Sequence, residues 1–194
     1  MTSKAPFSFV AAFANDPFAG NPAAIVFLDT SLPLEELGKI ARNLNQPILV
    51  VVSPESLPSE HDLKVECRSL RFLLCKDDRE VPICGHGTLA AAKAVFDLPE
   101  LAASGKEIIH FKTLYGHTLE ATKTKDGWIE IAIPSTVPGE IDADEKKRLK
   151  AFVDRAFGRD VKVNDIKTGG SLYPDCRVSL AKDETFANWY IKLL

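Results

Sequence analysis

Glu80-Val81-Pro82-Ile83-Cys84-Gly85-His86-Gly87-Thr88-Leu89-Ala90-Ala91-Ala92-Lys93-Ala94-Val95-Phe96 is the stretch that decides the fold of this 194-residue chain. A short extended run breaks at Pro82, a Cys-Gly-His-Gly-Thr turn follows, and residues 88–96 are apolar nearly all round a helical circumference. Such a helix has to be buried. The turn therefore lies at the N-terminus of a buried helix, where free backbone N–H groups and the helix dipole favour an anion.

A second motif, Asp16-Pro17-Phe18-Ala19-Gly20-Asn21-Pro22-Ala23-Ala24, lies upstream. Between the two motifs the sequence predicts a strand, a helix containing Ile40-Ala41 and a strand pair. In this order the motifs resemble the phenazine biosynthesis PhzF-like family, which belongs to the fold group of diaminopimelate epimerase and proline racemase. The resemblance is clear over about residues 7–134. Gly87 departs from the PhzF-like pattern, which usually has Ala there, and is closer to the proline racemase form.

The resemblance implies an α+β, diaminopimelate epimerase-like fold: a curved, mostly antiparallel sheet around the central helix 88–96. Residues 1–134 would form the first domain, and residues 135–194 a partial second lobe. Members of the family are longer and have two similar halves with the active site in the cleft between them. The Glu-Asp-Pro-x-Thr-Gly-Ser motif that completes the site in the second half does not occur in this sequence.

Hydrophobic periodicity and turn residues predict the individual elements. We expect a hairpin of strands 63–67 and 69–75, a charged turn at 76–79 and a break at Pro99-Glu100. The Thr168-Gly169-Gly170-Ser171 tract is interpreted as a hairpin turn. The other expected elements are strands 7–13, 23–28, 48–52, 108–114, 115–122, 128–133, 161–166 and 172–180, and helices 33–44, 143–157 and 183–194.

Composition excludes several classes of protein. A net charge of −3 and a pI near 5.8 provide no basic surface for nucleic acid. The sequence has no run of eighteen apolar residues and no signal-peptide apolar region, so no membrane partner is expected. The four cysteines have irregular spacing without a CxxC pair or a zinc pattern. We therefore expect a reduced, cytoplasmic protein with no metal or cofactor.

Two residues of the turn are candidate catalytic groups. Cys84 lies at a helix N-terminus, which stabilises a thiolate and can lower its pKa; the alternative is a small buried apolar residue. His86 titrates near neutrality and suits acid–base chemistry; the alternative is a histidine that caps the turn. The resemblance implies that Cys84 corresponds to one of two proton-transfer groups in racemases of this fold, and that His86 lies beside the substrate.

Four further residues are candidate substrate-binding groups. Gly85, Gly87 and Thr88 would offer backbone N–H groups and a hydroxyl to an anion, although turn geometry alone also accounts for the glycines. Asn21 could bind a ligand through its amide or bond its own backbone, and the local structural role is preferred.

One absence separates this chain from the resembled family. PhzF-like proteins carry a catalytic glutamate in a pattern such as Asn-Leu-Ser-Glu-Thr after the Ile-Ala helix. Here Asn45 matches the asparagine and Ile48 occupies the glutamate position. An alkyl group cannot accept a proton, and the amide of Gln46 has no usable basicity. Carboxylate-driven isomerisation is therefore not expected.

The missing base leaves two hypotheses. In the first, the chain is a secondary-metabolism enzyme, an isomerase or cyclase, that acts on a small carboxylated or polar substrate through positioning and hydrogen bonding from His86 and the Cys84 turn. In the second, it is a catalytically inactive relative that serves as a binding or partner subunit. Turnover of such a substrate would favour the first hypothesis, and ligand binding without turnover the second.

The C-terminal segment predicts an assembly. Phe186, Trp189, Tyr190 and Leu193 recur at helical spacing and form an apolar stripe that needs a partner surface. The stripe could pack on its own lobe. The preferred interpretation is a symmetric homodimer in which each chain covers the other's unfinished lobe.

Overall fold

The computed structural model describes residues 4–14, 16, 19–28, 32–54, 65–74, 79–169 and 176–184, with side chains at all of these positions except 54, 65–67 and 69. The chain divides into two compact units, Met1–Pro134 and Ser135–Leu194. Each unit is described by itself.

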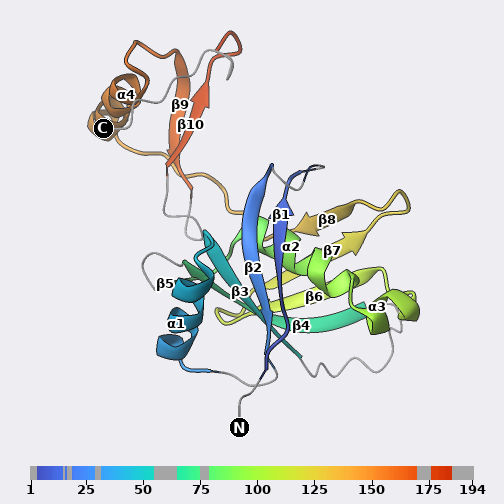
Figure 1. Ribbon diagram of the computed structural model, residues 1–194. Helices are drawn as coiled ribbons and strands as arrows, with labels where there is room; N and C mark the ends of the chain where they lie inside the picture. Colours follow the sequence, from blue (N-terminus) through green and yellow to red (C-terminus); the bar gives the residue numbers. More distant parts are fainter. Residues whose placement is uncertain are drawn as a thin grey trace. The chain divides into compact units, whose positions relative to one another are not determined.

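The first unit is built on one mixed sheet (Figure 1). Along the sheet the strands follow the order β1-β2-β3-β4-β6-β7-β8, and β5 pairs with β4. The β2–β3 and β4–β6 pairs are parallel and the other pairs are antiparallel. The strands are β1 (Phe7–Ala12), β2 (Asn21–Phe27), β3 (Ile48–Pro54), β4 (Val65–Leu74), β5 (Arg79–Val81), β6 (Ile108–Thr113), β7 (Thr118–Lys123) and β8 (Ile129–Ala132).

Helix α2 (Gly85–Phe96) is the centre of this unit. It contacts β1 and β8, which end the strand order, as well as β2, β3 and β7, so the sheet curls around it (Figure 1). Ala90, Ala91 and Ala92 are fully buried, and these small side chains let the strands approach the helix axis. Lys93 is exposed and forms an ion pair with Asp97. The predicted buried helix and curved α+β sheet are confirmed.

Helix α1 (Leu34–Leu44) packs on the outer face of the sheet, over β3 and β4. Strand β2 is buried on both faces, because Ala23 and Ile25 pack in the cluster around α2, whereas Ala24 and Val26 pack with α1. Strand β3 alternates in the same way. This double burial explains why both strands are near-continuous apolar runs.

The second unit contains α4 (Ala143–Phe157) and the antiparallel strands β9 (Val163–Thr168) and β10 (Cys176–Leu180). Asp142 Oδ1 accepts a hydrogen bond from Glu145 N at 2.8 Å and caps α4. No residue of α4 is buried. Lys150 pairs with Asp154 and Asp160, each at 2.6 Å, and the buried apolar residues of this unit include Val161 and Ile166.

Several expectations differ from the structure. The hairpin expected from 63–67 and 69–75 is wrong, since β4 runs unbroken from Val65 to Leu74. The break expected at Pro99-Glu100 is the first turn of a short helix, α3 (Pro99–Ser104). Three expected features lie mostly or partly outside the described residues: the turn at 76–79, the end of the 168–171 tract and nearly all of the helix 183–194.

Within the described part of the chain, no helix has the length and apolar character needed to cross a membrane.

Candidate active site at the N-terminus of α2

Cys84 occupies the N-cap of α2. Its backbone is extended, with φ −142° and ψ 108°, and the helix begins at the next residue. Thr88 closes the first turn, because its backbone N and its Oγ1 both donate to the carbonyl oxygen of Cys84, at 2.9 and 2.8 Å. Gly85, His86, Gly87 and Thr88 therefore lie in the first helical turn, where the sequence analysis expected a separate turn before a helix starting at residue 88.

A buried ion pair fixes the segment that leads to Cys84. Arg71 on β4 donates to both carboxylate oxygens of Glu80 on β5, at 3.0 and 2.9 Å, and to the carbonyl oxygen of Leu32 at 2.8 Å. The side chains of Arg71 and Glu80 are only 18% and 7% exposed. Such a bidentate pair has a defined geometry. The sequence pattern assigned no role to Glu80, and this positioning role was missed.

Cys84 and His86 form the polar pair of the site. Cys84 Sγ lies 3.4 Å from His86 Nδ1. Burial raises the pKa of the Cys84 thiol, although a hydrogen bond from the Gly87 backbone opposes the shift. Burial also lowers the pKa of His86. The direction is opposite to the lowered thiol pKa expected from the helix N-terminus, because desolvation outweighs the Gly87 hydrogen bond.

His86 also carries an unsatisfied nitrogen. Both pKa shifts favour the neutral forms near pH 7, so the thiol keeps its proton and can donate it to His86 Nδ1. We infer that the ring proton then resides on Nε2. That atom is buried, and no hydrogen-bond partner for it is found among the described residues. A buried donor without a partner is costly, which makes Nε2 a candidate contact for a ligand.

Gly87 lies in a closely packed position. A Cβ added at this position would lie 3.1 Å from Val50 Cγ2 and 3.2 Å from both Phe72 Cδ1 and Cys84 Sγ. Val50 and Phe72 are fully buried. A Cβ at Gly85, by contrast, would meet no atom within 4 Å. The absence of a side chain at position 87 therefore leaves room for Val50 of β3 and Phe72 of β4, which pack against the first turn of α2.

Ile48 lies on the same face of β3 as Val50. It is fully buried at the start of β3 and packs, as Val50 does, in the cluster around α2. Ile48, which the sequence analysis matched to the family glutamate, therefore lies on the face of β3 directed toward α2.

Asn21 lies on a different element from the other candidates. It is exposed, begins β2 and has Ala12 as its register partner. The preceding Gly20 has φ +87°, and a Cβ there would lie 2.4 Å from the Ala12 carbonyl oxygen, so a glycine is needed for the turn.

The structure brings Cys84, Gly85, His86, Gly87 and Thr88 together in one helical turn. A ligand role for Asn21 stays a prediction. Among the side chains that the structure describes, no group of three His, Cys, Asp or Glu could hold a metal ion.

Comparisons with known proteins identify the family. The family model described as phenazine biosynthesis-like protein, PhzC-PhzF, matches residues 10–185. The chain therefore belongs to the phenazine biosynthesis-like family. A phenazine biosynthesis-like domain-containing protein of Pongo abelii is 30% identical over 186 residues, which cover 83% of this chain and 62% of the relative. A protein of Halalkalibacterium halodurans named an uncharacterized isomerase is 33% identical, over 69% of this chain and 44% of its own length.

Solved structures agree with this assignment. A PhzF-family phenazine biosynthesis protein of Enterococcus faecalis matches with a TM-score of 0.69 and 26% identity, covering 96% of this chain and 61% of that chain. A Pseudomonas aeruginosa protein described as a predicted epimerase matches at 0.59 with 19% identity, over 81% and 51% of the two chains, and shows likeness of fold alone. The resemblance inferred from the sequence is confirmed. The chain spans less than two thirds of the length of these relatives.

Proposed function

We propose that this protein is an isomerase or cyclase of secondary metabolism that binds a small carboxylated or polar substrate at the N-terminus of α2. The observation that carries the proposal is the neutral Cys84–His86 pair, whose sulfur and Nδ1 atoms lie 3.4 Å apart, with His86 Nε2 buried and without a partner among the described residues. A family relative named an isomerase supports the reaction class.

Catalysis in this proposal depends on positioning and hydrogen bonding. The backbone N–H groups of Gly85 and His86 would hold an anionic group of the substrate, whereas those of Gly87 and Thr88 already bond to Cys84. The Nε2–H of His86 would donate to a substrate oxygen and stabilise charge that develops on it. Ile48 provides no base, so removal of a proton from carbon by a carboxylate at this position is excluded from the proposal.

The test measures conversion and proton exchange together. Small carboxylated compounds that raise the melting temperature would be incubated with the protein and analysed for products of unchanged mass and altered retention. Conversion should fall at least roughly tenfold in His86→Ala and stay unchanged in Cys176→Ser, whose cysteine is exposed in the second unit. Deuterium from the solvent should not enter a substrate C–H position. Enzyme-dependent incorporation, at a rate that matches turnover, would overturn the base-free mechanism.

The second candidate is a catalytically inactive relative that acts as a binding or partner subunit. The observation that favours it is the full burial of Ile48, the residue that we match to the family's carboxylate from the sequence pattern. Compounds that stabilise the protein through His86 but yield no product would support this alternative. In both cases we propose a cytoplasmic protein, for which the free thiols of Cys84 and Cys176 are suited.

A further inference from the structure

The Arg71–Glu80 ion pair lies on the outer face of the sheet, on the α1 side. The register partner of Arg71 is Val51 on β3. The register partner of Glu80 is Leu73 on β4. Val51 and Leu73 both pack in the cluster that contains residues of α1. Because register partners share a face of the sheet, the ion pair is on the α1 side, whereas the Cys84 turn begins the helix on the other side.

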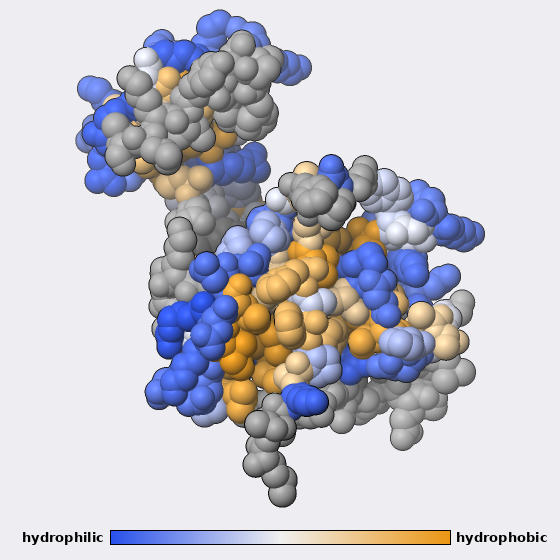
Figure 2. All heavy atoms as spheres, viewed as in Figure 1, coloured by the Kyte–Doolittle hydropathy of each residue, from blue (hydrophilic) through white to orange (hydrophobic). Residues whose placement is uncertain are grey.

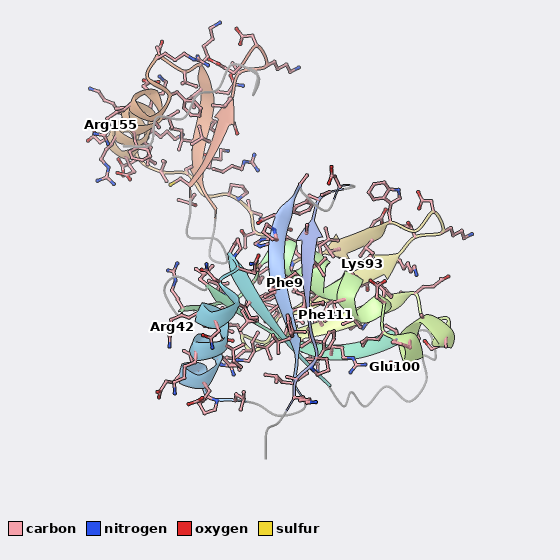
Figure 3. The ribbon with its side chains drawn as sticks, in the orientation of Figure 1. Phe9, Arg42, Lys93, Glu100, Phe111 and Arg155 are labelled. Carbon is pink, nitrogen blue, oxygen red and sulfur yellow. The ribbon has the colours of Figure 1, made fainter. Side chains whose placement is uncertain are left out.

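The two faces of the sheet can be followed in the figures. In Figure 3, Phe111, which is fully buried in the cluster around α2, lies inside the curled sheet, and Arg42 lies on α1 outside it. Figure 2 shows hydrophobic side chains next to the hydrophilic surface of α1. The side chains of Arg71 and Glu80 are mostly buried in this outer layer. Charges in such a place have to be paired.

The alternate residues of the same two strands support the first turn of α2. Phe72 follows Arg71 in the sequence and has Val81 as its register partner. Phe72 lies in the cluster around α2, and Val81 packs against that cluster. Phe72 is also close to Gly87, because a Cβ built at Gly87 would lie 3.2 Å from Phe72 Cδ1. A shift of β5 along β4 would therefore move residues on both faces of the sheet.

A short ladder joins β5 to β4. Strand β5 has three residues, and each of them has its register partner on β4. The bidentate contact between Arg71 and Glu80 has a defined geometry and opposes sliding of one strand along the other. Arg71 also donates to the carbonyl oxygen of Leu32 at 2.8 Å, beside the Pro33 N-cap of α1. One guanidinium group therefore fixes β5 to β4 and to the start of α1.

The connection from β5 to the candidate site is short and stiff. Two residues, Pro82 and Ile83, separate β5 from Cys84, the N-cap of α2. The ring of Pro82 fixes its own φ and restricts the backbone of the preceding Val81. A displacement of Glu80 would therefore displace Cys84 as well.

We propose that Arg71 is a positioning residue of the candidate site, which holds Cys84 Sγ against His86 Nδ1 through its bidentate pair with Glu80. The 3.4 Å contact between these two atoms then depends on an ion pair on the outer face of the sheet. This role rests on the proposed function for the identity of the site. Arg71 acts on the Cys84–His86 pair from a distance, so its replacement changes the geometry of the pair and removes no group from it.

The test compares two bidentate ion pairs of the full chain. Glu80→Gln and Arg71→Lys each remove the bidentate contact near the candidate site. Glu184→Gln is the matched control in the second unit. Glu184 accepts hydrogen bonds from both terminal nitrogens of Arg159, at 3.0 and 2.6 Å, and its side chain is 8% exposed, close to the 7% of Glu80. Circular dichroism verifies that each variant folds.

Two readouts need no substrate. In Glu80→Gln and Arg71→Lys, the alkylation rate of Cys84 in the native protein, relative to that of exposed Cys176, should rise at least roughly fivefold, because the turn opens more often. NMR of the His86 ring nitrogens should show some Nδ1–H tautomer in both variants and the Nε2–H tautomer alone in the wild type. The control should match the wild type in both readouts.

A double variant separates positioning from stability. Arg71→Leu combined with Glu80→Leu replaces the ion pair by apolar side chains, an exchange that often preserves stability. It should fold, even where a single variant does not, and still show both changes. A wild-type value of either readout in this double variant or in folded Arg71→Lys would overturn the proposal, as would changes of equal size in Glu184→Gln. Absence of turnover in the wild type would count against the proposed function alone, because neither readout depends on it.

Discussion

Cys84 Sγ and His86 Nδ1 lie 3.4 Å apart, and burial holds both groups in their neutral forms. The pair therefore differs from a thiolate–imidazolium couple, in which both groups would be charged. This difference leads to two predictions on titration and reactivity. Two further predictions concern the packing that holds the pair in place.

Acid should destabilise the protein through His86. Burial lowers the pKa of His86, so the unfolded state, with a pKa of about 6.5, binds the proton more tightly. The contribution of neutral His86 to the free energy of unfolding is complete above about pH 6.5. This contribution is lost as the pH falls through the pKa of His86 in the folded state. Urea midpoints between pH 8 and pH 5 should show this loss in the wild type and a smaller loss in His86→Gln. Identical pH profiles, or an NMR titration that places the pKa of His86 above 6.5, would contradict it.

Cys84 should react slowly. Its raised pKa keeps the thiol protonated, and its side chain is half-buried, whereas Cys176 is exposed. Alkylation of the native protein at pH 7.5, mapped by peptide mass, should modify Cys176 at least roughly tenfold faster than Cys84. Denaturant should remove the difference. If Cys84 reacted first in the native protein, the helix N-terminus would outweigh burial, and the neutral-pair mechanism would need revision.

Charge inside the curled sheet should not be tolerated. Ala91 is fully buried on α2, so Ala91→Glu would bury an unpaired carboxylate at a cost of several kcal/mol, a large part of an ordinary domain's stability. Lys93→Glu is the control on the same helix, since Lys93 is exposed, and it should change stability by about 1 kcal/mol or less. Thermal melting followed by circular dichroism distinguishes them. Equal melting temperatures would refute the central position of α2.

The two glycines of the first turn should respond oppositely to alanine. Gly87→Ala would force a methyl group against Val50 and Phe72, and we expect a loss of about 1–3 kcal/mol. Gly85→Ala meets open space and should be neutral or stabilising by up to about 1 kcal/mol. Val50→Ala should partly rescue Gly87→Ala in a double-mutant cycle. If the two mutations showed no coupling, the close contact would not be the reason for the glycine.

Features that depend on neighbouring residues could be predicted from the sequence, whereas features that depend on distant strands could not. The apolar circumference of α2 is local information, and it predicted a buried helix correctly. Strand β4 was misread as a hairpin because its continuity depends on distant partners: residues 65–70 pair with β6 and residues 68–74 with β3. The Arg71–Glu80 pair joins separate strands and has no local signature. The raised pKa of Cys84 was missed for the same reason, since burial depends on the whole sheet.

The candidate site was predictable in its residues and not in its chemistry. The Cys-Gly-His-Gly-Thr motif located the polar pair, but the protonation state of the pair depends on its surroundings. The reason for Gly87 was also hidden, because Val50 and Phe72 reach it from strands far along the chain. The homodimer expected from 183–194 stays a prediction, because that segment falls almost entirely outside the described residues.

The curled sheet around α2 also constrains how the protein is made. Strand β1 leaves the ribosome before the other elements of the first unit, yet it packs on a helix that ends at Phe96, and β8, which also contacts that helix, ends at Ala132. The first unit therefore cannot complete its core until almost all of it has been synthesised. Such non-local contacts slow folding. During that interval the uncharged β1 strand is exposed, which makes the nascent chain a candidate client for chaperones that bind extended apolar segments.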